Sequence, residues 1–168
     1  MAIYDNDGTT AYEIGKVYDN DGTANHQIGK VYDYDGTVNS LIYTATKSIY
    51  PDTDGVGLTF NEVQDSINGN LTLWFNTGSV VNRYSNKPFD TTGFTKLVFV
   101  VADVGTYADR WVNAGLGNKQ GDPNVAYVGV ASSAGTYKLD ISNYQGAYYL
   151  CMRGRYAPNI QFSAIYLE

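Results

Sequence analysis

The seven-residue stretch YADRWVN, from Tyr107 to Asn113, gathers side chains that could hold a polar ligand. Tyr107 and Trp111 offer flat rings that can stack on the apolar faces of sugars. Asp109, Arg110 and Asn113 can hydrogen-bond hydroxyl groups. This mixture is typical of a carbohydrate-contacting surface. Large aromatic residues also dominate cores and subunit interfaces, so both interpretations stand.

Aromatic residues elsewhere in the chain could extend such a platform, namely Trp74, Tyr127 and Tyr156. Trp74 and Tyr156, together with residues of the stretch above, give the candidate glycan-binding set: Trp74, Tyr107, Asp109, Arg110, Trp111, Asn113 and Tyr156.

We expect no catalytic residue and no cofactor. A glycosidase needs two carboxylates facing each other across a cleft, and nothing in the sequence pairs its aspartates in that way. Cys151 is the only cysteine and lies in the apolar run YYLCMRG, which is typical of a small buried side chain. The only histidine, His26, is far away along the chain, so a Cys–His nucleophile is not expected.

Paired aspartates recur near the start of the chain in the phrase Asp-x-Asp-Gly. A calcium loop of the EF-hand type places oxygen ligands at its positions one, three and five. The first of these positions would fall on Ile3, Val17 or Val31, which have no side-chain oxygen. We therefore interpret these aspartates as turn residues and expect no metal site.

The charge balance argues against several classes of partner. The net charge is −6 and no Lys/Arg cluster exists, so nucleic-acid binding is not expected. Arg153 and Arg155 are expected to form ordinary surface ion pairs. No apolar run is long enough to span a bilayer. The first residues lack the basic and apolar regions of a signal peptide, so we expect synthesis in the cytoplasm without secretion by that route.

Three tandem repeats of fourteen residues occupy residues 3–16, 17–30 and 31–44. Each places short β-forming runs around an Asp-Gly turn, since glycine accepts the positive φ that tight turns need. The turn positions are Asp7, Gly8, Asp21, Gly22, Asp35 and Gly36. The positions expected to pack against neighbours are Ile3, Tyr4, Ile14, Val17, Tyr18, Ile28, Val31, Tyr32 and Ile42.

These repeats have too little apolar surface to build a core of their own. Isolated hairpins are marginal in water, and repeat units need neighbours to cover their apolar faces. The neighbours could be the same repeats in other chains, with three chains wound about a shared axis. The alternative is a β-meander folded against the C-terminal part of the same chain.

The rest of the chain predicts an all-β head. Residues 45–57 are expected to be a linker, and residues 58–168 contain eight or nine short strand-like segments separated by turn residues, without helical periodicity. This pattern is typical of an antiparallel sandwich of jelly-roll type. Alternation places Leu71, Leu73 and Phe75 on one face of their strand. The segment KLVFVVA is apolar on both faces, which predicts a doubly buried central strand.

The repeat phrase IGKVYDNDGT, followed by a β domain containing AGTYKLDIS, GAYYLCMRG and IYLE, resembles bacteriophage virion structural proteins of the head-fibre, tail-fibre or baseplate type. The repeats also resemble the triple β-spiral shafts of viral fibres. The resemblance implies a homotrimer on the particle surface, contacts with other virion proteins through the repeats, and recognition of a cell-surface glycan. No catalytic residue carries over from it.

The expected function is therefore that of a non-enzymatic virion fibre or decoration protein whose head binds host-surface carbohydrate. Two alternatives remain open. One is a purely architectural protein that cements a capsid or baseplate and binds no glycan. The other is a carbohydrate-binding module of a secreted bacterial protein.

The proposed packing of the repeats between chains predicts that the mass of the protein in solution depends on them. We expect the full chain to be a trimer and a chain shortened to begin near Thr46 to be a monomer, because the repeats need partner chains to cover their apolar positions. Light scattering of both proteins measures this. A monomer in both cases would contradict the shaft and favour the folded-back meander.

Overall fold

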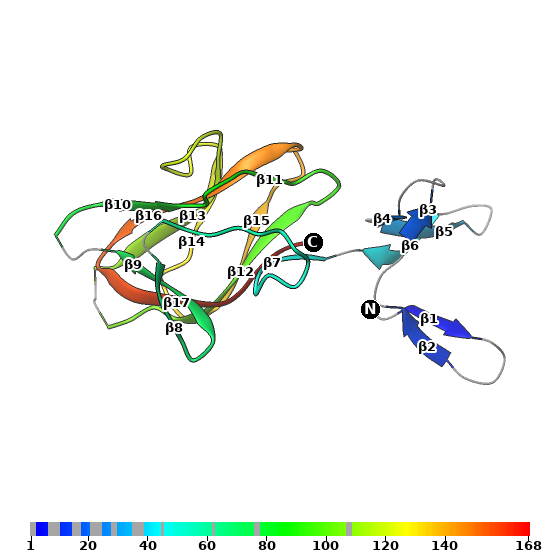
Figure 1. Ribbon diagram of the computed structural model, residues 1–168, viewed down its shortest axis with the longest axis horizontal. Helices are drawn as coiled ribbons and strands as arrows, with labels where there is room; N and C mark the ends of the chain where they lie inside the picture. The colour runs from blue at the N-terminus through cyan, green and yellow to red at the C-terminus, as the bar shows by residue number, and fades with distance from the viewer. Residues whose placement is uncertain are drawn as a thin grey trace. The chain divides into compact units, whose positions relative to one another are not determined.

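Figure 1 shows the computed structural model, in which every regular element of the described residues is a β-strand. The structure describes residues 46–61, 63–75, 78–106 and 109–168, together with the backbone of short strands before residue 46. The chain divides into two compact units, Met1–Thr46 and Lys47–Glu168. The predicted all-β class is confirmed.

The described residues of the first unit form three antiparallel strand pairs. They are β1 (Ile3–Asn6) with β2 (Ala11–Ile14), β3 (Tyr18–Asn20) with β4 (Asn25–Gln27), and β5 (Lys30–Tyr34) with β6 (Asn39–Thr44). Ile3 lies opposite Ile14 in the first pair, and Val31 lies opposite Tyr43 in the third.

The residues predicted to matter in the repeats are only partly described. The turn residues Asp7, Gly8, Asp21, Gly22, Asp35 and Gly36, and the packing residues Val17 and Ile28, lie outside the described residues. The remaining packing residues lie on strands whose backbone alone is described, namely Ile3, Tyr4, Ile14, Tyr18, Val31, Tyr32 and Ile42. Their packing against other chains therefore stays a prediction.

The second unit consists of two antiparallel sheets (Figure 1). The β12 sheet contains, in spatial order, β15 (Gly135–Asp140), β12 (Lys96–Asp103), β17 (Ala157–Leu167), β9 (Asn70–Phe75) and β8 (Val63–Ile67), and β7 (Lys47–Tyr50) also pairs with β17. The β13 sheet contains β10 (Val81–Tyr84), β16 (Ala147–Arg155), β13 (Trp111–Gly117) and β14 (Ala126–Gly129), and β11 (Phe89–Asp90) pairs with β16 next to β10.

The chain passes repeatedly from one sheet to the other. Hairpins keep β8 with β9 and β13 with β14 in the same sheet. β10 and β11 also stay in the same sheet, because both pair with β16. All the remaining connections from β9 to β17 change sheet. The last of these is made by Tyr156 alone, between β16 and β17. Its φ of 56° lies in the left-handed region, which turns the chain sharply at this corner.

One apolar core lies between the two sheets. Leu71, Leu73 and Phe75 of β9 are buried in it, as their alternation predicts. From the facing sheet, Val112 and Leu116 of β13 enter the same cluster. Because these inner faces bury each other, the alternate positions of each strand must lie on the outer faces of the sandwich.

The strand β12 contains the predicted segment KLVFVVA. Leu97, Phe99 and Val101 belong to the core, and Val98 is fully buried although it points to the outer face. In register, Val98 lies between Lys138 of β15 and Tyr166 of β17, whose long side chains can cover it. The prediction of a central strand is confirmed, because β12 lies between β15 and β17. Burial on both faces is borne out only at Val98, since Val100 is partly exposed and Ala102 is exposed on the outer face.

Part of the expected linker over residues 45–57 belongs to a sheet. Lys47–Tyr50 forms β7, and Ile49 is only 2% exposed. This strand is too short for periodicity to reveal it, and its pairing with the last strand depends on residues more than a hundred positions away. After it, Asp52 accepts hydrogen bonds from the N–H groups of Val56 and Gly57, both at 2.7 Å, so this aspartate stabilises a turn.

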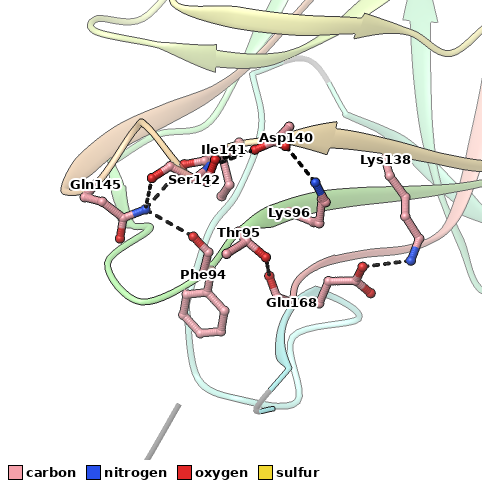
Figure 2. Close-up of polar contacts among 9 residues, drawn as sticks. All are labelled: Phe94, Thr95, Lys96, Lys138, Asp140, Ile141, Ser142, Gln145 and Glu168. Carbon is pink, nitrogen blue, oxygen red and sulfur yellow. Dashed lines mark hydrogen bonds and ion pairs between the residues drawn. The ribbon is translucent and has the colours of Figure 1, made fainter. Parts of the chain in front are cut away.

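Polar contacts fasten the C-terminus to the start of β12 (Figure 2). Lys96 and Glu168 exchange backbone hydrogen bonds of 2.9 and 3.0 Å. The Nζ atom of Lys96 lies 2.8 Å from Asp140 Oδ2, and the Nζ atom of Lys138 lies 2.7 Å from Glu168 Oε1. The hydrogen bond from Lys96, followed by those from Ser142, lowers the pKa of Asp140. Since these ion pairs are exposed, they fix geometry more than they add stability.

Candidate functional site

The outer face of the β13 sheet carries a row of polar residues across its strands. In register, Asn82 of β10 lies opposite Arg153 of β16, which in turn lies opposite Asn113 of β13. Asn113 faces Gly129 of β14 on its other side. Because Val112 and Ala114 point into the core, the alternation of β13 directs Trp111 and Asn113 outward.

A loop over residues 118–124, here called the covering loop, lies on this outer face. Gly117 permits its close approach, because a Cβ at that position would lie 2.9 Å from the Lys119 carbonyl oxygen and 2.7 Å from Cys151 Sγ. Real Cβ atoms hardly ever come so close to backbone atoms. The glycine therefore lets the loop fold back directly over the sheet.

Hydrogen bonds fix the covering loop at both ends and in the middle. Asn118 and Asn124 bind each other, with Asn124 Nδ2 2.9 Å from Asn118 Oδ1 and Asn118 N 3.2 Å from Asn124 Oδ1. Gln120 Nε2 donates to the carbonyl oxygens of Ser85 at 3.3 Å and Asn86 at 3.2 Å. The loop thus reaches across the sheet from β13 to the end of β10.

Two hollows are lined by the outward residues of β13. The first hollow has a volume of about 190 Å³ and is lined by Trp111, Asn113, Asp122, Pro123, Tyr127 and Arg153. The second hollow has a volume of about 210 Å³ and is lined by Arg110, Trp111, Val112, Asn113, Gly129, Ala131 and Ser132. Trp111 and Asn113 belong to both.

The arginines of the two hollows already have partners in the protein. Arg153 Nη1 lies 2.6 Å from Asp122 Oδ2, the surface ion pair expected from the sequence. In the second hollow, Arg110 Nε donates to the Ala131 carbonyl oxygen at 2.9 Å, and Nη2 donates to that of Ser132 at 3.3 Å. The first hollow thus carries a balanced pair of charges.

One carboxylate oxygen of Asp122 has no hydrogen-bond donor among the described residues. Its Oδ2 atom binds Arg153, whereas its Oδ1 atom is buried and has no hydrogen-bond partner among the described residues. A buried carboxylate oxygen without a donor raises the free energy of the folded state.

The structure brings together three of the seven candidate residues, Arg110, Trp111 and Asn113. Trp74 is not among them, because it lies on β9, between the core residues Leu73 and Phe75, and so points to the outer face of the other sheet.

The other three candidates do not line either hollow as far as the structure describes them. Asp109 is exposed beside the second hollow's Arg110. Tyr156 lies at the corner between β16 and β17, where the guanidinium of Arg155 stands over its ring at 4.9 Å from the centroid. Tyr107 lies outside the described residues.

Sequence reasoning left out several residues of the hollows. Asp122 and Pro123 belong to the covering loop and line the first hollow. Gly129 belongs to β14 and lines the second hollow without a side chain. Tyr127, an aromatic residue considered above, is 59% exposed and completes the first hollow. One sign of this arrangement was available in the sequence. β13 and β14 are close together along the chain, which favours a hairpin whose two strands place residues on the same face of the sheet.

Cys151 lies under the covering loop and is fully buried. Its Sγ atom donates a weak hydrogen bond to the Lys119 carbonyl oxygen at 3.5 Å. Burial, with a smaller effect from the neighbouring Asp122 carboxylate, raises the pKa of the thiol from 9.0 to about 11. The thiol is therefore protonated at neutral pH and serves as a small packing group.

This raised pKa predicts an alkaline loss of stability. The folded chain keeps the Cys151 proton between about pH 9 and pH 11, where the unfolded chain releases it, so the free energy of unfolding falls as the pH rises through this range. Urea unfolding at pH 8 and pH 10.5 should show a larger loss for the natural chain than for Cys151→Ala. Tyrosine ionisation is common to both proteins and cancels. Equal losses, or rapid thiol labelling of the folded chain at pH 8, would contradict this account.

No metal-binding group of three or more His, Cys, Asp or Glu residues occurs among the described residues. The same described part of the chain has no helix long and apolar enough to cross a membrane. Comparison with known proteins identifies no matching family model, no similar curated protein and no similar solved structure.

Proposed function

We propose that this chain is a non-enzymatic virion fibre or decoration protein of a bacteriophage, whose second unit binds carbohydrate on the host surface. The observation that supports the binding role is the convergence of Trp111, Tyr127, Asn113 and the Asp122–Arg153 pair around one hollow. Small-molecule sites combine aromatic walls with a few placed polar groups. Sugars match both, through their apolar faces and their hydroxyl groups.

The path of the chain supports a jelly-roll head as the finer description of the fold. The spatial orders β9-β17-β12-β15 and β10-β16-β13-β14, with repeated crossings between the two sheets, are those expected of two interlocked Greek keys. In this arrangement the outer face of the β13 sheet is free to carry a ligand site while the inner face builds the core.

The repeats supply the attachment in this proposal. Trimers formed through residues 1–44, held on other virion proteins, would present several heads on one particle. Linked sites gain avidity of about 10²–10⁴-fold over a single site when geometry allows simultaneous binding. A weak single site is therefore sufficient for adhesion.

One observation favours the architectural alternative. Tyr127 is 59% exposed on β14, which is an edge strand of the β13 sheet. Edge strands with exposed aromatic residues are suited to contacts with another protein chain. In that case the same surface would cement a neighbouring subunit and would bind no glycan.

A pair of tryptophan substitutions tests the proposed site. Binding of the full chain to an array of bacterial surface glycans should fall about tenfold or more for Trp111→Ala, which is about 1.4 kcal/mol, because the substitution removes the ring shared by both hollows. Trp74→Ala is the matched control, since it removes the same ring from the outer face of the other sheet.

Thermal unfolding verifies that both variants fold. Equal binding by both variants and the natural chain would remove the proposed residues from the adhesive role. Absence of glycan binding by the natural chain would favour the architectural alternative.

A further inference from the structure

We propose that the site takes a neutral oligosaccharide of at least two sugar units, with one unit in each hollow and Trp111 and Asn113 between them. This inference rests on the proposed carbohydrate-binding function and deepens it. It concerns the length and the charge of the ligand.

The volumes of the hollows argue for the length. Sites for small molecules typically measure about 300–1,000 Å³. The first hollow, at about 190 Å³, and the second, at about 210 Å³, each lie below this range, whereas the two together reach it. Since both are lined by Trp111 and Asn113, a ligand that leaves one hollow over these residues enters the other.

The residues that line one hollow can together bind one sugar unit. The first hollow offers the Tyr127 ring together with the Asp122 and Arg153 pair. The second hollow offers the Ser132 hydroxyl group, whose oxygen lies 2.8 Å from the Tyr137 hydroxyl oxygen, and Gly129, where the strand has no side chain. The shared Asn113 amide can donate to one unit and accept from the other.

The charges argue for a neutral ligand. The guanidinium of Arg153 is already compensated by Asp122 at 2.6 Å. The guanidinium of Arg110 donates to two backbone carbonyl oxygens that fix its position. An acidic sugar would add a negative charge beside Asp122, in a chain whose net charge is −6.

Gly129 permits a substitution that blocks the second hollow alone. A Cβ at this position would meet only Asn113 Oδ1, at 3.8 Å, which is an ordinary contact. Gly129→Val should therefore fold and fill the second hollow. Tyr127→Ala opens the first hollow instead, at a residue that is already 59% exposed. Thr136→Val, on an exposed position of β15 in the other sheet, is the matched control.

The experiment measures affinities by calorimetry for the full chain and these variants. The probes are glucose, galactose, mannose and N-acetylglucosamine, their linear dimers and trimers, and sialylated counterparts. For the best probe, the dimer should bind about tenfold or more tightly than the monomer, because the second unit binds as an intramolecular neighbour of the first. Gly129→Val should reduce the dimer to the affinity of the monomer. Tyr127→Ala should weaken both, and Thr136→Val neither.

The possible failures are distinguishable. If a monomer binds as tightly as its dimer, or if Gly129→Val leaves dimer binding intact, the two-unit inference is wrong while the binding function stands. Tighter binding of sialylated probes than of neutral ones would overturn the inference that the ligand is neutral. No binding to any probe by the natural chain would overturn the proposed function and this inference with it.

Discussion

The mutual burial of two apolar sheet faces is the constraint on which the second unit depends. Residues such as Phe99 and Phe162 of the β12 sheet, and Leu116 and Met152 of the β13 sheet, are completely buried in one cluster. A strand has a period of two, so each residue committed to this cluster sends its neighbours to the opposite face. The outward position of Trp111 and Asn113 is thus a consequence of the inward position of Val112 and Ala114.

The covering loop gives this outer face a hollow where the sheet alone would be flat. A sheet alone presents a shallow row of side chains, whereas the loop adds Asp122 and Pro123 as a wall beside Tyr127. The absence of a side chain at Gly117 allows the loop to approach, and the ion pair between Arg153 and Asp122 holds it over β16. Side-chain hydrogen bonds, glycine placement and one ion pair therefore build the first hollow together.

Sequence patterns were sufficient for much of the fold, since alternation and apolar runs are local properties. They identified β12 residue by residue and the buried face of β9. They also predicted a polar-ligand surface at the segment YADRWVN, and the structure brings Arg110, Trp111 and Asn113 of this segment together around one hollow. They could not identify β7, because four residues carry too little periodicity and the pairing of β7 with β17 is set by the tertiary fold.

The composition of the site was harder to predict, because it depends on which sheet each strand joins. Trp74 and Trp111 appear equivalent in the sequence, yet β9 and β13 belong to different sheets, so their rings point to opposite outer faces. Asp122 and Arg153 are 31 positions apart and meet only because the covering loop crosses β16. No local pattern contains that information.

The central claim is that the ligand surface lies on the outer face of the β13 sheet. Backbone amide resonances of the full chain, recorded by NMR during titration with the best-binding neutral oligosaccharide, test it most directly. The account predicts shifts concentrated in residues 111–113, 122–132 and 153, with β9 unaffected. Shifts centred on Trp74 and its neighbours in the β12 sheet would contradict it.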